Sequence, residues 1–195
     1  MDRWARRQLL WHDPKEATAI GNALIVAVPV GAALALGLMA HADGAGLREG
    51  TEDLLVMTES TAVTLVIMQV AKFSVARWRP DAWAGSGSTT ANSRMSFFAG
   101  HSSTAFAVAA SATQVLRLRG RPGWGWFAAA AFSGAAASGF FRIASDNHWT
   151  TDVLAGAAVG TAVGLALPPL VLHEARDGTP ALTLGVAPGG LALHF

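Results

Sequence analysis

The feature that most constrains this chain is a series of long apolar runs separated by polar connections. Five runs are long enough to be helices, and we expect them at residues 17–40, 52–73, 102–117, 124–142 and 151–172. Asp13-Pro14 leads into the first run and suits a helix N-terminus. Pro168-Pro169 predicts that the fifth run kinks or ends there. The sequence therefore predicts an all-α bundle of about five long helices.

Three of the five runs approach the roughly 20 residues that a helix needs to cross a bilayer. Gly156, Gly160 and Gly164 recur every four residues in the fifth run, a spacing that lets helices pack closely in lipid. Only 14% of the residues are charged, whereas 52% are hydrophobic. We therefore predict a membrane helical bundle. A soluble, alanine-rich bundle is the alternative, and the mean hydropathy of +0.37 keeps it open.

The length of 195 residues suits one domain. We expect a single helical domain over residues 1–173 and a separate tail over 174–195. Apolar residues alternate in the tail on either side of Ala187-Pro188-Gly189-Gly190, which is typical of a short β-hairpin. A frayed terminal extension is the alternative. The chain has no cysteine, which excludes disulfides and thiolate chemistry.

The charges are balanced in number but not in position. The net charge of +1 provides no general field for nucleic acid. Twelve of the fourteen cations are arginines, and no carboxylate lies between Asp81 and Asp146. The short connection after the third run carries Arg117, Arg119 and Arg121, which the positive-inside rule places in the cytoplasm. The 74–100 and 143–151 connections then share the external face. The same count puts the N-terminus outside, against the preference of its own cations.

Polar residues capable of chemistry gather at the ends of the predicted helices. Up-down alternation of the helices brings these ends to one side of the bundle. They supply three cations, two imidazoles and one carboxylate: Lys72, Arg79, Arg142, His101, His148 and Asp152. Arginine and lysine bind phosphate oxygens, and backbone N–H groups near Gly100 can add to them at a helix N-terminus. A neutral histidine can attack phosphorus, and a second histidine can protonate the leaving oxygen.

The spacing of these residues resembles that of the type 2 phosphatidic acid phosphatase superfamily. This family includes membrane lipid phosphate phosphatases, class A acid phosphatases and vanadium-dependent haloperoxidases. Its pattern is Lys-x6-Arg-Pro, then Pro-Ser-Gly-His, then Ser-Arg-x5-His-x3-Asp. The chain carries these three motifs, in order, as Lys72 to Arg79-Pro80, Phe98-Ala99-Gly100-His101, and Phe141-Arg142 with His148 and Asp152.

The resemblance implies a role for each matching residue. His148 would be the nucleophile that forms a phosphohistidine, Asp152 its orienting partner and His101 the acid for the leaving group. The phosphate oxygens would be held by Lys72, Arg79, Gly100 and Arg142. No cofactor and no metal is implied. Ala99 departs from the pattern, because it replaces a serine whose hydroxyl would donate to phosphate, and Phe98 and Phe141 replace proline and serine.

The predicted function is metal-independent hydrolysis of a lipid phosphate or diphosphate, of the undecaprenyl diphosphate or phosphatidyl phosphate class. The expected location is a bacterial inner membrane, with several membrane passes and the active site on the external, periplasmic side. The alternatives are a soluble periplasmic acid phosphatase, a vanadate-dependent haloperoxidase, and a catalytically silent membrane scaffold or lipid-binding module. Three further charged residues stay outside the predicted catalytic set. Glu59 is expected to line the bundle interior, and Arg77 and Asp146 to form a solvated pair or specificity contacts.

Overall fold

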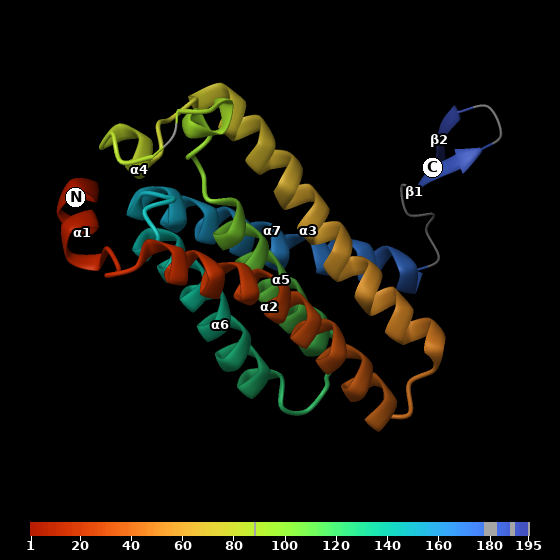
Figure 1. The fold of residues 1–195 in the computed structure, drawn as a ribbon. Helices are drawn as coiled ribbons and strands as arrows, with labels where there is room; N and C mark the ends of the chain where they lie inside the picture. Colours follow the sequence, from red (N-terminus) through yellow and green to blue (C-terminus); the bar gives the residue numbers. More distant parts are fainter. Residues whose placement is uncertain (88, 178–182, 188–189, 195) are drawn as a thin grey trace.

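The chain folds as a bundle of long helices with one helix at its centre (Figure 1). The computed structural model describes residues 1–87, 89–177, 183–187 and 190–194. The long helices are α2 (Pro14–Ala42), α3 (Leu47–Val75), α5 (Gly100–Leu118), α6 (Trp124–Ala144) and α7 (Thr150–Asp177). The shorter helical segments are α1 (Asp2–Leu9), α4 (Pro80–Trp83) and the 3-10 turn η1 (Ala91–Arg94). The all-α bundle predicted from the apolar runs is confirmed.

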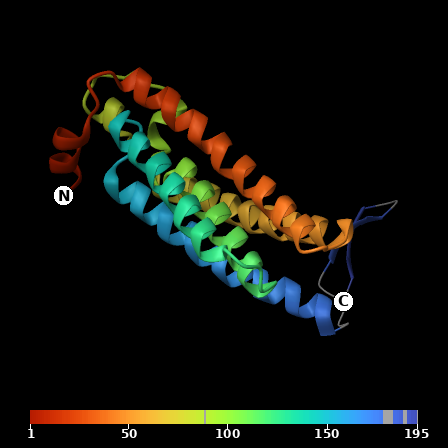
Figure 2. The ribbon, with the colours of Figure 1, turned by 90° about the horizontal axis from the view of Figure 1, so that it is seen from below.

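Helix α5 is the centre of the bundle because it contacts all four other long helices. Its core positions are small, and Ala105, Ala109 and Ala112 are completely buried. Small side chains let the neighbouring backbones approach closely, which suits a helix surrounded on all sides. Figure 2 shows the long helices running side by side along the length of the molecule.

The closest packing joins α5 to α7 along the predicted glycine face. A Cβ atom at Gly156 would lie 2.8 Å from the Ala99 carbonyl oxygen, and one at Gly164 would lie 2.6 Å from the Ala107 carbonyl oxygen. A Cβ atom at Gly160 would meet the Ser103 carbonyl oxygen. Because backbone atoms cannot move aside cheaply, these three positions admit only glycine. The face of α7 predicted from the small-residue spacing is therefore the face that contacts α5.

Four helices are long and apolar enough to cross a membrane: Pro14–Ala42, Leu47–Trp83, Trp124–Ala144 and Thr150–Leu172. Large apolar side chains on the first two are exposed, including Leu34, Leu38, Val66 and Phe73. Exposed apolar side chains along such long helices are typical of contact with lipid.

The structure corrects the predicted end of the last helix. Pro168 and Pro169 lie inside α7, which continues to Asp177, beyond the predicted end of the fifth run at residue 172. Pro168 is fully buried, so packing against the bundle stabilises the helix where two backbone N–H donors are missing. Beyond it, strands β1 (Thr183–Ala187) and β2 (Gly190–His194) pair antiparallel, in agreement with the alternating sequence of the tail.

The two ends of the bundle carry different charge clusters. At the end where α2 joins α3, a buried ion network links the α5–α6 connection to α3. Within it, Arg121 lies 2.8 Å from Asp53 and 2.7 Å from Glu49, and Arg119 lies 2.9 Å from Asp53. The opposite end holds α1, α4 and the connections that carry the three motifs (Figure 1).

Candidate active site

The predicted catalytic residues all lie at the α1 end of the bundle. Lys72 is in the last turn of α3, Arg142 is in the last turn of α6, and Arg79 is the N-cap of α4. Gly100 and His101 begin α5, while Asp152 is in the first turn of α7. His148 is in the short turn between α6 and α7. Helix ends, and for His148 the turn between two of them, therefore position these side chains.

The His148 imidazole is buried and held in one tautomer. Its Nδ1 lies 2.8 Å from the Ser96 carbonyl oxygen, which can only accept a hydrogen bond. Nδ1 must therefore carry the proton of the neutral ring, which leaves the lone pair on Nε2. Burial lowers the pKa of His148 to about 4; the Asp152 carboxylate opposes this shift, and the charges of Arg79 and Arg142 add to it. At neutral pH the ring is therefore uncharged.

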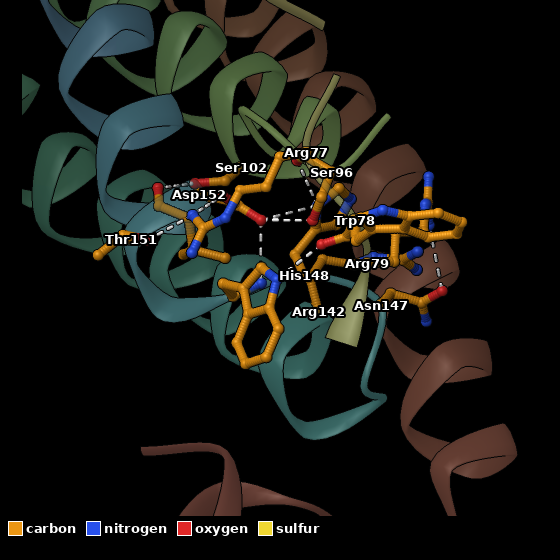
Figure 3. Close-up of polar contacts among 12 residues, drawn as sticks. Arg77, Trp78, Arg79, Ser96, Ser102, Arg142, Asn147, His148, Thr151 and Asp152 are labelled. Atoms are coloured by element: carbon orange, nitrogen blue, oxygen red, sulfur yellow. Dashed lines mark hydrogen bonds and ion pairs between the residues drawn. The ribbon is translucent and has the colours of Figure 1, made fainter. Parts of the chain in front are cut away.

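Asp152 is completely buried and lies 3.9 Å from His148 Nδ1, a separation for ionic attraction and not for a hydrogen bond. Its carboxylate accepts three other hydrogen bonds instead. The donors are Arg77 Nη1 at 2.5 Å, Ser96 Oγ at 2.5 Å and the Trp149 backbone N–H at 3.1 Å (Figure 3). Ser96 thus holds His148 through its carbonyl oxygen and Asp152 through its hydroxyl.

Arg77 does not pair with Asp146, so the interpretation of these two as a solvated pair is wrong. Arg77 joins Asp152 to the N-terminal helix, because its Nη2 lies 2.6 Å from Asp2 Oδ2. Asp146 pairs with Arg6, which also belongs to the N-terminal helix α1, at 2.6 Å. The sequence offered no signal for either contact, since the partners are separated by 75 and 140 residues.

The cations surround the start of α5. A Cβ atom at Gly100 would lie 3.6 Å from Lys72 Nζ, so glycine keeps this space open beside the ammonium group. Arg79 donates to the Asn92 carbonyl oxygen at 3.1 Å. Arg142 is buried, and its Nε has no hydrogen-bonding partner among the described residues. A buried, unsatisfied guanidinium N–H is suited to an anion.

His101 lies in the first turn of α5, outside the four candidate membrane spans. Positively charged side chains surround its ring. Burial, together with the charges of Arg142, His148, Lys72 and Arg79, lowers the pKa of His101 to about 4. Charged side chains from separate helix ends therefore lie close enough to His101 to lower its pKa. A phosphate group bound there would offset their charge and favour the protonated form of His101.

No nearby serine replaces the hydroxyl that is missing at Ala99. Ser96 Oγ donates to Asp152, Ser102 Oγ donates to the Val153 carbonyl oxygen at 2.9 Å, and Ser103 Oγ donates to the Gly100 carbonyl oxygen at 3.0 Å. Ala99 itself is completely buried at the N-cap of α5. The candidate phosphate site therefore lacks that donor.

Asn22 of α2 is a site residue that the sequence interpretation missed. Its Oδ1 lies 3.2 Å from Arg142 Nη1 and 3.2 Å from His101 Nε2. A polar amide within a long apolar run was the available signal, because such groups in a membrane helix usually face a functional interior. In the described part of the chain, no group of three or more histidine and carboxylate side chains is arranged to hold a metal ion.

Comparison with known proteins identifies one family and one relative. The PAP2 superfamily model matches residues 53–175. The chain is 34% identical over 125 residues to Lipid A 1-phosphatase of Porphyromonas gingivalis. That alignment covers 62% of this chain and 25% of the relative, so the chain spans about a quarter of the relative's length. No solved structure matches the chain.

Proposed function

The chain belongs to the PAP2 superfamily, and from this premise we propose that it is a metal-independent phosphatase acting on a lipid phosphate or diphosphate. The carrying observation is the state of His148. Its ring is neutral, its Nδ1 proton is fixed on the Ser96 carbonyl oxygen, and cationic side chains surround it. An imidazole with a free Nε2 lone pair beside an anion site is equipped to attack phosphorus.

In the first step, His148 Nε2 forms a bond to phosphorus while the bond from phosphorus to the leaving oxygen breaks. His101 gives a proton to that oxygen. The imidazolium that forms at His148 is stabilised by Asp152, whose carboxylate is 3.9 Å from Nδ1. Lys72 and Arg142 hold the equatorial oxygens, where negative charge spreads in the transition state.

In the second step, water attacks the phosphohistidine and gives its proton to His101. The bond from phosphorus to Nε2 breaks, and its electrons return to His148. The products are inorganic phosphate and the dephosphorylated lipid, and both histidines regain their starting states. The site completes this cycle with its own acid, base and cations.

A lipid substrate is supported by the fold and by the relative. The protein is multi-pass, with four helices able to cross a membrane, and Lys72, Arg142 and Asp152 lie near the ends of three of them. The relative's name specifies a lipid phosphate as its substrate. We propose the undecaprenyl diphosphate or phosphatidyl phosphate class for this chain, and phosphorylated glycolipids belong in the same assay.

The test is phosphate release from these lipids by the full chain in detergent with EDTA present. We expect release by the unmodified chain, labelling of the protein by ³²P-lipid after an acid-free quench, and loss of both in His148→Ala. Equal release by the two proteins would overturn the phosphohistidine mechanism. Loss of activity in EDTA alone would overturn metal independence.

We propose a bacterial inner membrane with the active site on the periplasmic face. The basis is the α5–α6 connection, whose arginines predict a cytoplasmic position: Arg117, Arg119 and Arg121. Ion pairing with carboxylates does not cancel this preference, since Asp and Glu contribute little to it. The chain has no cysteine, so Ser86→Cys gives a single exposed thiol at the catalytic end. Labelling of this thiol from the external side would support the proposed orientation. Labelling only from the cytoplasmic side would show that the orientation is the reverse.

A further inference from the structure

Asn22 makes a pair of contacts that fixes the hydrogen positions around His101. A guanidinium group has only donors, so the Asn22 atom that faces Arg142 Nη1 at 3.2 Å must be the carbonyl oxygen. The same oxygen lies 3.2 Å from His101 Nε2. Since that oxygen can only accept, Nε2 must carry a hydrogen. The neutral His101 ring therefore has its lone pair on Nδ1.

We propose that Asn22 is the positioning residue of the general acid and base His101, keeping a hydrogen on Nε2 so that Nδ1 is the nitrogen that gives and takes the catalytic proton. This inference rests on the proposed phosphatase function. Nδ1 of His101 has no hydrogen-bonding partner among the residues described. Asn22 Oδ1 can hold Nε2–H in both the neutral and the protonated ring, so the ring need not turn between the two steps.

The proton balance follows from this arrangement. Protonated His101 gives its Nδ1 proton to the leaving oxygen as the bond from that oxygen to phosphorus breaks. The attacking water later returns one proton to Nδ1 as the phosphohistidine is hydrolysed. Without Asn22 the neutral ring can carry its hydrogen on either nitrogen, and one of the two tautomers cannot accept the proton at Nδ1.

The charges that face His101 explain why a neutral partner suits this position. Arg142 of α6, Lys72 of α3, Arg79 of α4 and the His148 ring all disfavour a second positive charge there. A carboxylate in place of Asn22 would also accept from both groups, but its negative charge would weaken the binding of phosphate and so raise KM. The amide accepts from both groups and adds no charge.

The leaving group separates this role from a role in phosphate binding. An alkyl phosphate has a poor leaving group that needs a proton, whereas p-nitrophenyl phosphate has a good one that departs without it. We expect Asn22→Leu to lower kcat on a soluble short-chain alkyl phosphate by roughly 100-fold. On p-nitrophenyl phosphate the same variant should lose no more than about 3-fold. A similar loss on both substrates would mean that Asn22 only holds Arg142 and would overturn the inference.

Asn22→Asp is the matched variant, because it keeps the acceptor oxygen and adds a negative charge. We expect it to recover most of the kcat on the alkyl phosphate, although KM rises, and to move the basic limb of the kcat profile up by about one pH unit, because an anion favours protonated His101. If the basic limb of the profile did not move, or if kcat did not recover, the inference would be overturned. The aspartate variant alone tests the inference if the leucine variant fails to fold. If the unmodified chain released no phosphate from any substrate, the proposed function itself would fail before any variant was compared.

Discussion

Arg77 donates to the Asp152 carboxylate at 2.5 Å, while His148 Nδ1 stays 3.9 Å from the same carboxylate. The buried carboxylate is thus held mainly by a guanidinium, and the histidine is oriented mainly by the Ser96 carbonyl oxygen. Arg77 is in turn held by Asp2, so the N-terminal helix α1 is connected to Asp152 through two ion pairs.

Replacing Arg77 should therefore impair catalysis without removing any group that contacts phosphate. We expect Arg77→Met to lower kcat by about 10 to 100-fold, because Asp152 loses its strongest partner while remaining buried. KM should change little. Arg94→Met is the control, since Arg94 is a nearby exposed arginine that stacks on Trp78. Steady-state kinetics on one lipid phosphate measure both, and an equal loss in the two variants would contradict the prediction.

Restoring the family hydroxyl should strengthen phosphate binding. In Ala99→Ser, the new side chain stands at the N-cap of α5 beside Gly100, where it can donate to a phosphate oxygen or cap the helix. We expect kcat/KM to rise by about 10-fold, which corresponds to one hydrogen bond to a charged group. Ala99→Cys adds a group of similar size with a weak donor and should show a much smaller gain. A rise in both variants would assign the effect to packing.

The glycine face of α7 should tolerate no side chain. Gly160→Ala places a methyl group against the Ser103 carbonyl oxygen and 2.9 Å from the Ala107 nitrogen. We expect destabilisation by about 3 kcal/mol, seen as a lower thermal midpoint in detergent. Gly37→Ala in α2 is the control, because nothing lies within 4 Å of its Cβ position. That variant should be neutral or slightly stabilising, as alanine has the higher helix propensity.

The stability of the fold should fall as the pH drops from about 6.5 to about 4. Burial lowers the pKa of His148 from 6.5 to about 4, so in this window the unfolded chain binds a proton that the folded chain does not. The free energy of unfolding should therefore decrease by up to roughly 3 kcal/mol across the window for this residue. Chemical unfolding at several pH values measures the slope. His148→Gln should make the slope shallower but not abolish it, because the pKa of His101 is also lowered to about 4, and an unchanged slope would contradict the assignment.

The ion network at the other end of the bundle should be structural. Asp53 is completely buried and lies within 3 Å of both Arg119 and Arg121. Asp53→Asn leaves two guanidinium groups with one less charge between them, and we expect a loss of about 3 kcal/mol or more. Arg48→Gln breaks an exposed pair with Glu52 and should cost less than about 1 kcal/mol. Unfolding midpoints of the two variants test this difference.

The sequence by itself determined the helices and predicted most of the residues of the candidate site. Long apolar runs have few folded solutions, because a helix satisfies its own backbone hydrogen bonds while it buries or presents apolar surface to lipid. Lys72, Arg79, His101, Arg142 and His148 lie at helix ends, and alternation of helix direction is enough to bring such ends together. Glycine spacing along one strip of α7 likewise predicted a contact face from local periodicity alone.

Only the tertiary structure decided which groups touch one another. Asn22 meets His101 and Arg142, and Arg77 meets Asp152, because helices distant in the sequence are packed at particular rotations and depths. Periodicity gives the residues that share a face, but hydrogen-bond partners depend on differences of about an ångström between neighbouring helices. The spacing between His148 and Asp152 therefore could not predict the ion pair of Asp152. Arg77 is its partner because the packing of the helices brings the two side chains together.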